Sequence, residues 1–197
     1  MTGHIEVKVQ GIKVKPRVVD TETALRSGIE ELWSFVGKGT GSKYVMGLDI
    51  ECTPVESTNK VSVLKLAAGS LCLIIRLLNL GTIPHFLFNF LRLPDVSFVG
   101  VGIKDNVDLL RRDYGLECRN AVDLATLAAS VLDDPRLVGY GLVDLANQVI
   151  PLQVMKKPAC AFFSDWSGEN LTTEEIEFAT IDAYISYKIG NKLLGGL

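Results

Sequence analysis

The sequence predicts a single α/β domain in which a mixed β-sheet is flanked by helices. Apolar runs of strand length and helical periodicities follow one another along the chain, with strands near 44–52, 60–68, 71–78 and 97–103 and helices near 22–36 and 172–194. Such mixing of strands and helices is typical of an α/β sheet, and the second and third strands favour an antiparallel hairpin within it. The 197 residues suffice for one good-sized core and are few for two domains.

The remaining segments complete this prediction. Residues 4–19 alternate apolar and polar side chains and predict an N-terminal β-hairpin or a bent strand. The glycine-rich stretch 37–43 lacks phosphate-loop spacing and is interpreted as a linker. Shorter elements are expected as helices near 84–91, 105–114, 123–131 and 141–149, a strand near 122–124 and a loop over 151–170. We therefore divide the domain 1–197 into an N-terminal extension, about 1–40, and a core, about 41–194.

Two carboxylates mark the end of the apolar strand YVMGLDIEC, residues 44–52. Because side chains alternate along a strand, Asp49 and Glu51 share one face and Ile50 points into the opposite layer. Adjacent anions repel each other and are costly to desolvate, so a divalent metal is the simplest compensation and removal of one anion is expected to raise metal-free stability. The alternative is an ordinary solvated strand end.

Further acids occupy unusual positions later in the chain. Asp105 opens a predicted helix directly after the strand SFVGVGI, and Asp182 lies on the apolar side of the last helix, where a carboxylate needs a partner. Taken singly, Asp105 suits a helix N-cap and Asp182 a half-exposed acid. Taken with Asp49 and Glu51, they form a set of acids spread over three elements.

Composition limits the classes of partner. The net charge of −3 and pI of about 5.4 argue against a protein that coats duplex DNA, although bound cations would permit contact with a nucleic-acid end. A hydrophobic content of 48% and mean hydropathy of +0.27 indicate a buried subunit interface. Four well-separated cysteines indicate a reducing, intracellular location, and we expect neither a membrane span nor a signal peptide.

Three separated motifs resemble the DEDD superfamily of 3′–5′ exonucleases, and most closely its Werner-type branch. They are GLDIEC, FVGVGIKDNVDLL and SDWSGENLTTEEIEFATIDAYISYKIG, and the resemblance covers roughly residues 44–194. It implies an α/β, RNase H-like (DnaQ-like) fold: a central mixed five-stranded sheet flanked by helices, here with an N-terminal β-hairpin extension.

The resemblance also implies the site. Its catalytic and metal-binding acids carry over as Asp49, Glu51, Asp105 and Asp182, which would bind two divalent cations, Mg²⁺ or Mn²⁺. The loop before Asp105 is one residue shorter than usual, which leaves Asp108 as the alternative third acid.

The third motif departs from the family pattern at the position that orients the attacking water. The family places a tyrosine or a histidine near the last acid, whereas this chain has Phe178 and Glu177 at the two positions. The rate is in question more than the chemistry, because metals alone generate hydroxide. Ile50, Lys156 and Lys157 are the candidate substrate contacts.

The resemblance extends to the small plant RISC-interacting clearing exoribonucleases. It implies a homo-oligomeric exoribonuclease that trims single-stranded RNA from the 3′ end, acts with a small-RNA effector complex in microRNA turnover, and is cytoplasmic in preference to nuclear. The alternatives are a 3′–5′ DNA exonuclease and a catalytically weak nucleic-acid-binding protein on the same fold. No residue in the sequence decides between RNA and DNA.

Overall fold

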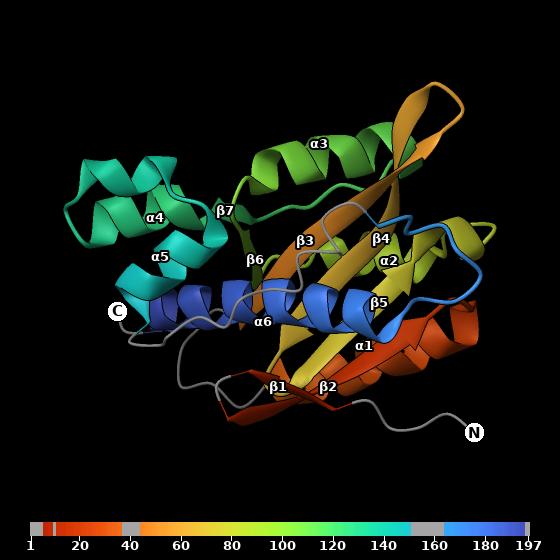
Figure 1. Ribbon diagram of the computed structural model, residues 1–197, viewed down its shortest axis with the longest axis horizontal. Helices are drawn as coiled ribbons and strands as arrows, with labels where there is room; N and C mark the ends of the chain where they lie inside the picture. Colours follow the sequence, from red (N-terminus) through yellow and green to blue (C-terminus); the bar gives the residue numbers. More distant parts are fainter. Residues whose placement is uncertain (1–5, 10, 37–43, 151–163, 196–197) are drawn as a thin grey trace.

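A β-sheet with helices on both faces forms the body of the protein, seen in a computed structural model (Figure 1). The structure describes residues 6–9, 11–36, 44–150 and 164–195. The strands are β1 (Val7–Val9), β2 (Ile12–Val19), β3 (Tyr44–Val55), β4 (Thr58–Ala68), β5 (Leu71–Arg76), β6 (Val96–Gly100) and β7 (Ala121–Asp123). The helices are α1 (Glu22–Val36), α2 (His85–Leu91), α3 (Ile103–Tyr114), α4 (Leu124–Val131), α5 (Leu142–Val149) and α6 (Thr173–Gly195), with 3₁₀ turns η1 (Leu77–Asn79) and η2 (Pro135–Gly139).

The sheet has seven strands in the order β1-β2-β5-β4-β3-β6-β7. Strand β4 runs antiparallel to both of its neighbours, whereas β3, β6 and β7 run parallel. These strands and β5 form the predicted mixed five-stranded sheet. The predicted N-terminal hairpin is also present, and it extends the same sheet because β2 pairs in parallel with β5.

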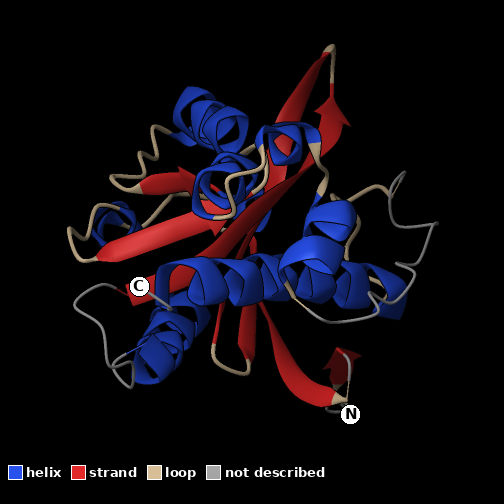
Figure 2. Ribbon diagram, turned by 90° about the vertical axis from the view of Figure 1, so that its left-hand side faces the viewer, coloured by secondary structure: helices blue, strands red, loops and turns tan. Residues whose placement is uncertain are grey.

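Each face of the sheet carries its own core, as Figure 2 shows by the helices packed on both sides of the strands. Val45 and Val63 point to the face covered by α4, α5 and α6, while their neighbours Met46 and Leu64 point to the face covered by α1, α2 and α3. This is the alternation expected of strands buried on both sides. Polar side chains in register with Val45 and Val63 therefore lie beneath α6.

Helix α6 crosses the centre of the sheet at close range. A Cβ atom added at Gly47 of β3 would clash with the carbonyl oxygen of Ala183, and one added at Gly190 would clash with Val99 of β6. Glycine at both positions lets helix and strand backbones approach each other. Asp182, next to Ala183, is thereby placed directly above β3.

The start of α6 is fixed by a capping box. The Thr172 hydroxyl accepts a hydrogen bond from the Glu175 backbone N–H at 3.2 Å, and the Glu175 carboxylate accepts one from the Thr172 N–H at 2.8 Å. Two backbone donors that the helix leaves unpaired are thus satisfied.

Helix α3 begins two residues earlier than predicted. Gly102, with φ of 66°, occupies the cap position in the left-handed region, and its N–H donates to the Asp123 carboxylate at 2.8 Å. The expectation that Asp105 caps this helix is therefore wrong, because Asp105 lies within the first turn. The predicted end of α3 is confirmed, since Gly115 is the C-cap residue and adopts φ of 68°.

Beyond the sheet, β3 and β4 continue as a two-stranded ribbon that projects at the top of Figure 1. The register shifts between Glu51 and Cys52, where a bulge separates the ribbon from the body of the sheet. Helix α3 braces the ribbon, because Asp113 accepts a hydrogen bond from the Val61 N–H at 2.8 Å and the Tyr114 hydroxyl donates to the Val61 carbonyl at 2.5 Å.

The other boundaries lie within a few residues of the prediction. The third predicted strand is shorter than expected, since β5 ends at Arg76 and gives way to η1. Among the helices of the described residues, none combines the length and apolarity needed to cross a membrane.

Candidate active site

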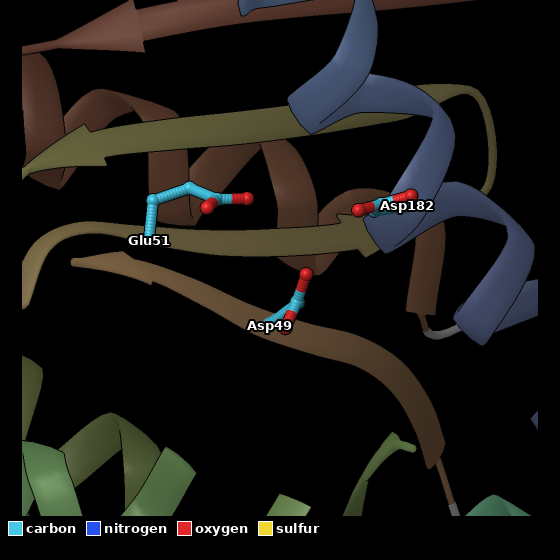
Figure 3. Close-up of side chains that lie close together, drawn as sticks. All are labelled: Asp49, Glu51 and Asp182. Carbon is cyan, nitrogen blue, oxygen red and sulfur yellow. The ribbon is translucent and has the colours of Figure 1, made fainter. Parts of the chain in front are cut away.

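Three of the four predicted acids meet beneath α6. Asp49 and Glu51 project from β3 and Asp182 from α6, and one carboxylate oxygen of each lies within 4.8 Å of the others (Figure 3). The shared face of Asp49 and Glu51 follows from strand alternation, and Asp182 is only 6% exposed on the sheet-facing side of its helix. The predicted pairing of a strand end with the last helix is thus present in the fold.

A lysine that the sequence analysis missed lies among these carboxylates. Lys65 of β4 is directly opposite Asp49 in the antiparallel register, so both side chains point to the same face. Its Nζ atom lies 2.6 Å from Asp49 Oδ2, 2.6 Å from Glu51 Oε1 and 3.7 Å from Asp182 Oδ2, and the side chain is 0% exposed. The repulsion between the two strand anions, for which the sequence suggested a metal as compensation, is thus also offset by an ammonium of the protein.

The carboxylates keep the buried ammonium charged. Burial alone lowers the pKa of Lys65, but Asp49, Glu51 and Asp182 together raise it well above the ordinary value. Burial raises the pKa of Glu51, and Lys65 opposes that rise. With the three carboxylates ionised, the cluster carries a formal charge of −2, which still favours a further cation.

Helix α3 reaches the cluster through Asn106. The Asn106 amide donates a hydrogen bond to Asp49 Oδ1 at 3.1 Å. Asp105 is exposed and is not a member of the carboxylate group, and Asp108 forms an ion pair with Arg111 at 2.8 Å on the protein surface. The ligand role of Asp105 or Asp108 remains a prediction. The side chain that α3 places beside Asp49 is the amide of Asn106.

Phe178 lies close to the cluster. Its ring centroid is 5.5 Å from Lys65 Nζ, it is 4% exposed, and Trp166 packs against it with centroids 6.2 Å apart. Glu177 is partly exposed and lies outside the carboxylate group. The ring, and not the neighbouring carboxylate, therefore forms one wall of the site.

Of the three predicted substrate contacts, the structure describes one, Ile50. Ile50 is buried in the core on the opposite face, under α1, α2 and α3. Lys156 and Lys157 lie outside the described residues.

A buried arginine holds the segment that leads into α6. The Arg76 guanidinium, at the end of β5, donates to the carbonyl of Glu169 at 2.7 Å and also to that of Gly168. Hydrogen bonds from a charged donor are among the stronger ones in proteins. The approach to α6, with the Trp166 that packs on Phe178, is thereby tied to the sheet.

The donor set suits divalent cations. All three acids offer oxygen, the ligand that Mg²⁺ and Mn²⁺ prefer, and their spacing within 4.8 Å fits the predicted pair of divalent ions. Lys65 shares the same oxygens, so a metal would bind beside a positive charge that belongs to the protein.

An α/β sheet that carries clustered carboxylates on its central strand and last helix defines the class of metal-dependent phosphodiester hydrolases. A family model described as 3′-5′ exonuclease matches residues 16–197, and the chain belongs to this family. The predicted DEDD superfamily and RNase H-like fold are thereby confirmed, and the chain is a DnaQ-like 3′–5′ exonuclease domain.

Relatives of known sequence support the assignment. Human "Exonuclease 3'-5' domain-containing protein 2" is 33% identical over 159 residues, which cover 77% of this chain and 25% of that protein. Arabidopsis thaliana "Protein RISC-INTERACTING CLEARING 3'-5' EXORIBONUCLEASE 1" is 23% identical over 150 residues, which cover 74% of this chain and 72% of that protein. The chain thus spans a quarter of the human relative and most of the Arabidopsis one.

Solved structures agree with the fold. The EXD2 exonuclease domain soaked in Mn superposes with a TM-score of 0.54 at 30% identity and covers 92% of this chain and 90% of that domain. Escherichia coli RNase D superposes with a TM-score of 0.75 at 20% identity and covers 92% of this chain and 44% of that protein. The manganese soak of a related domain accords with the divalent-cation site inferred from the carboxylates.

Proposed function

We propose that this chain is a metal-dependent 3′–5′ exoribonuclease that removes nucleotides from the 3′ end of short single-stranded RNA. The observation that carries the proposal is the meeting of Asp49, Glu51 and Asp182 within 4.8 Å in a chain of the 3′–5′ exonuclease family. Hydrolysis of the bond between the phosphorus and the 3′ oxygen of the preceding nucleotide would release nucleoside 5′-monophosphates.

Each side chain has a distinct task in this proposal. Asp49, Glu51 and Asp182 would hold the cations, which when bound supply an acidified water and neutralise phosphate charge. Lys65 and Asn106 hold the two oxygens of Asp49 from opposite elements, β4 and α3, and so fix the orientation of that carboxylate. A preorganised carboxylate lowers the cost of placing the reacting groups.

The preference for RNA rests on the Arabidopsis relative, whose name specifies an exoribonuclease and which resembles this chain in length. DNA is the second candidate substrate. The EXD2 exonuclease domain has been soaked with both GMP and dGMP, so its structures favour neither sugar.

The experiment compares RNA and DNA oligomers of one sequence, labelled at the 5′ end, with Mg²⁺ and with Mn²⁺. We expect a ladder of products shortened from the 3′ end, which forms faster from RNA than from DNA. The Asp182→Asn protein should give no ladder. A ladder of equal rate for both substrates would remove the RNA preference. Absence of degradation by the folded wild-type protein under every metal condition would remove the activity.

Phe178 and Lys65 favour one further candidate, a catalytically weak nucleic-acid-binding protein on the same fold. Phe178 lacks the hydroxyl of the tyrosine that the resemblance places at its position, Glu177 stands at the histidine position, and an ammonium shares the metal ligands. Fluorescence anisotropy with the same oligomers separates the two functions, since this candidate binds RNA without shortening it.

We also propose that the chain assembles into homo-oligomers. Three apolar side chains, Val131, Leu132 and Val138, are 41%, 47% and 57% exposed at the end of α4 and on η2, which pack together. Light scattering should give a multiple of 21.5 kDa, and a constant 21.5 kDa over a wide concentration range would exclude assembly. Service to a small-RNA effector complex is a finer proposal that rests on the name of the Arabidopsis relative alone.

A further inference from the structure

We propose that Lys65 is a built-in competitor for divalent cations, which weakens the hold of Asp49 and Glu51 on metal and so sets the metal concentration at which the site fills. The inference rests on the proposed function, since it concerns metal binding by the same carboxylates. It assigns to Lys65 a regulatory role at the site that the acids alone do not suggest.

The position of Lys65 is fixed by the fold. Its residue pairs with Asp49 in the β3–β4 register, and its side chain is fully enclosed beneath α6. Turning the ammonium out to solvent would require displacing α6, whose backbone is in close contact with β3 at Gly47. The positive charge therefore stays in the cluster when a metal approaches.

The competition is for specific atoms. Lys65 engages Asp49 Oδ2 and Glu51 Oε1, each at 2.6 Å, and Asn106 engages Asp49 Oδ1 at 3.1 Å. Three of the four carboxylate oxygens of Asp49 and Glu51 thus already contact a Lys65 or Asn106 nitrogen. A divalent cation that uses these oxygens must share them with the ammonium and lie close to a like charge.

The same contacts stabilise the metal-free protein. Without the ammonium, three carboxylates would face one another in a largely buried site. Loss of the Lys65 charge is therefore expected to have two opposite effects, tighter metal binding and lower stability without metal. A lysine that served only to pack the core would show the second effect without the first.

The test is calorimetric titration of Mn²⁺ into the full chain at constant neutral pH, together with melting temperatures with and without Mn²⁺. Lys65→Gln should bind Mn²⁺ more tightly, by about tenfold or more, because one positive charge has left the site. It should melt lower than wild type without metal and gain more from Mn²⁺. Lys60→Gln is the matched control: the same charge is lost on the same strand, from a side chain that lies over the Tyr114 ring, and Mn²⁺ affinity should not change.

Equal Mn²⁺ affinity in wild type and Lys65→Gln would overturn the inference and leave the proposed function standing. Failure of both proteins to bind Mn²⁺ would overturn both. If Lys65→Gln does not fold without metal, folding restored by Mn²⁺ supports the inference, because the metal then replaces the ammonium. If neither Lys65→Gln nor Lys65→Met folds at any Mn²⁺ concentration, the inference fails, since the charge then serves the fold.

Discussion

Phe178 lies over the Lys65 ammonium, with 5.5 Å between the ring centroid and Nζ. This is within the distance at which a cation is attracted to the face of an aromatic ring. The ring comes from α6 four residues before Asp182, so one helix supplies both a carboxylate and an aromatic wall. Phe178 thus belongs to the site and also to the packing around Trp166.

A hydroxyl on this ring should improve catalysis. We expect Phe178→Tyr to raise kcat by about tenfold with little change in KM, because a phenol at the site can orient the attacking water. Kinetics with a short RNA and a melting curve on the same preparation provide the test. Unchanged kcat with a lower melting temperature would show that the hydroxyl is buried without a partner.

Loss of Asp49 should cost both activity and stability. Asp49→Ala removes a metal ligand and one of the close partners of a fully buried ammonium, so we expect no measurable exonuclease activity and a loss of roughly 1–3 kcal/mol in metal-free unfolding free energy. This reverses the stabilisation expected from the sequence. Urea denaturation measures it, with Asp95→Ala as an exposed acidic control. An Asp49→Ala protein more stable than wild type would contradict the role given to Lys65.

The close approach of α6 to β3 can be tested at Gly47. Gly47→Ala places a methyl group against the Ala183 carbonyl, so we expect a loss of roughly 1–3 kcal/mol in stability and weaker Mn²⁺ binding as Asp182 shifts from β3. Gly139→Ala is the control, since nothing lies within 4 Å of an added Cβ there. Unaltered Mn²⁺ affinity in a destabilised Gly47→Ala protein would show that the cluster tolerates movement of the helix.

The contact between α3 and β4 should depend on pH. A hydrogen bond from Arg112 lowers the pKa of Asp113 below its ordinary value of 3.8, so its contribution to stability is present above pH 3.8 and lost as pH falls through the folded pKa. We expect Asp113→Asn to be less stable than wild type near pH 6, by about 0.5 kcal/mol, and equally stable at low pH. Denaturation across this range measures the difference, and a gap that persists at low pH would contradict the assignment.

Local patterns in the sequence account for the parts of the site that were predicted. Asp49 and Glu51 share a face because strand alternation is a property of adjacent residues. Asp182 was identified because it interrupts the apolar side of a helix. Each of these patterns involves residues only a few positions apart in the sequence, so it depends on local structure and not on how the strands pair.

Lys65 was missed because its role depends on register. The stretch VSVLKLAA shows a lysine within an apolar strand, but only the pairing with β3 reveals that it faces Asp49. Asn106 depends in the same way on the start of α3. Gly102 is the N-cap residue, so α3 starts at Ile103. With this start, Asn106 points to Asp49 and Asp105 is exposed.

The bulge at Glu51 and Cys52 has a consequence for how this domain tolerates changes in length. Below the bulge, Lys65 pairs with β5 as well as with Asp49 and lies beneath α6. Above the bulge, within the described residues, the ribbon strands pair with each other and contact α3. Insertions of residue pairs at the ribbon tip, around Glu56, should therefore lengthen the hairpin without altering the register beneath. A reporter or a recognition loop could therefore be inserted at the tip without changing the register of the strands that carry the active-site residues.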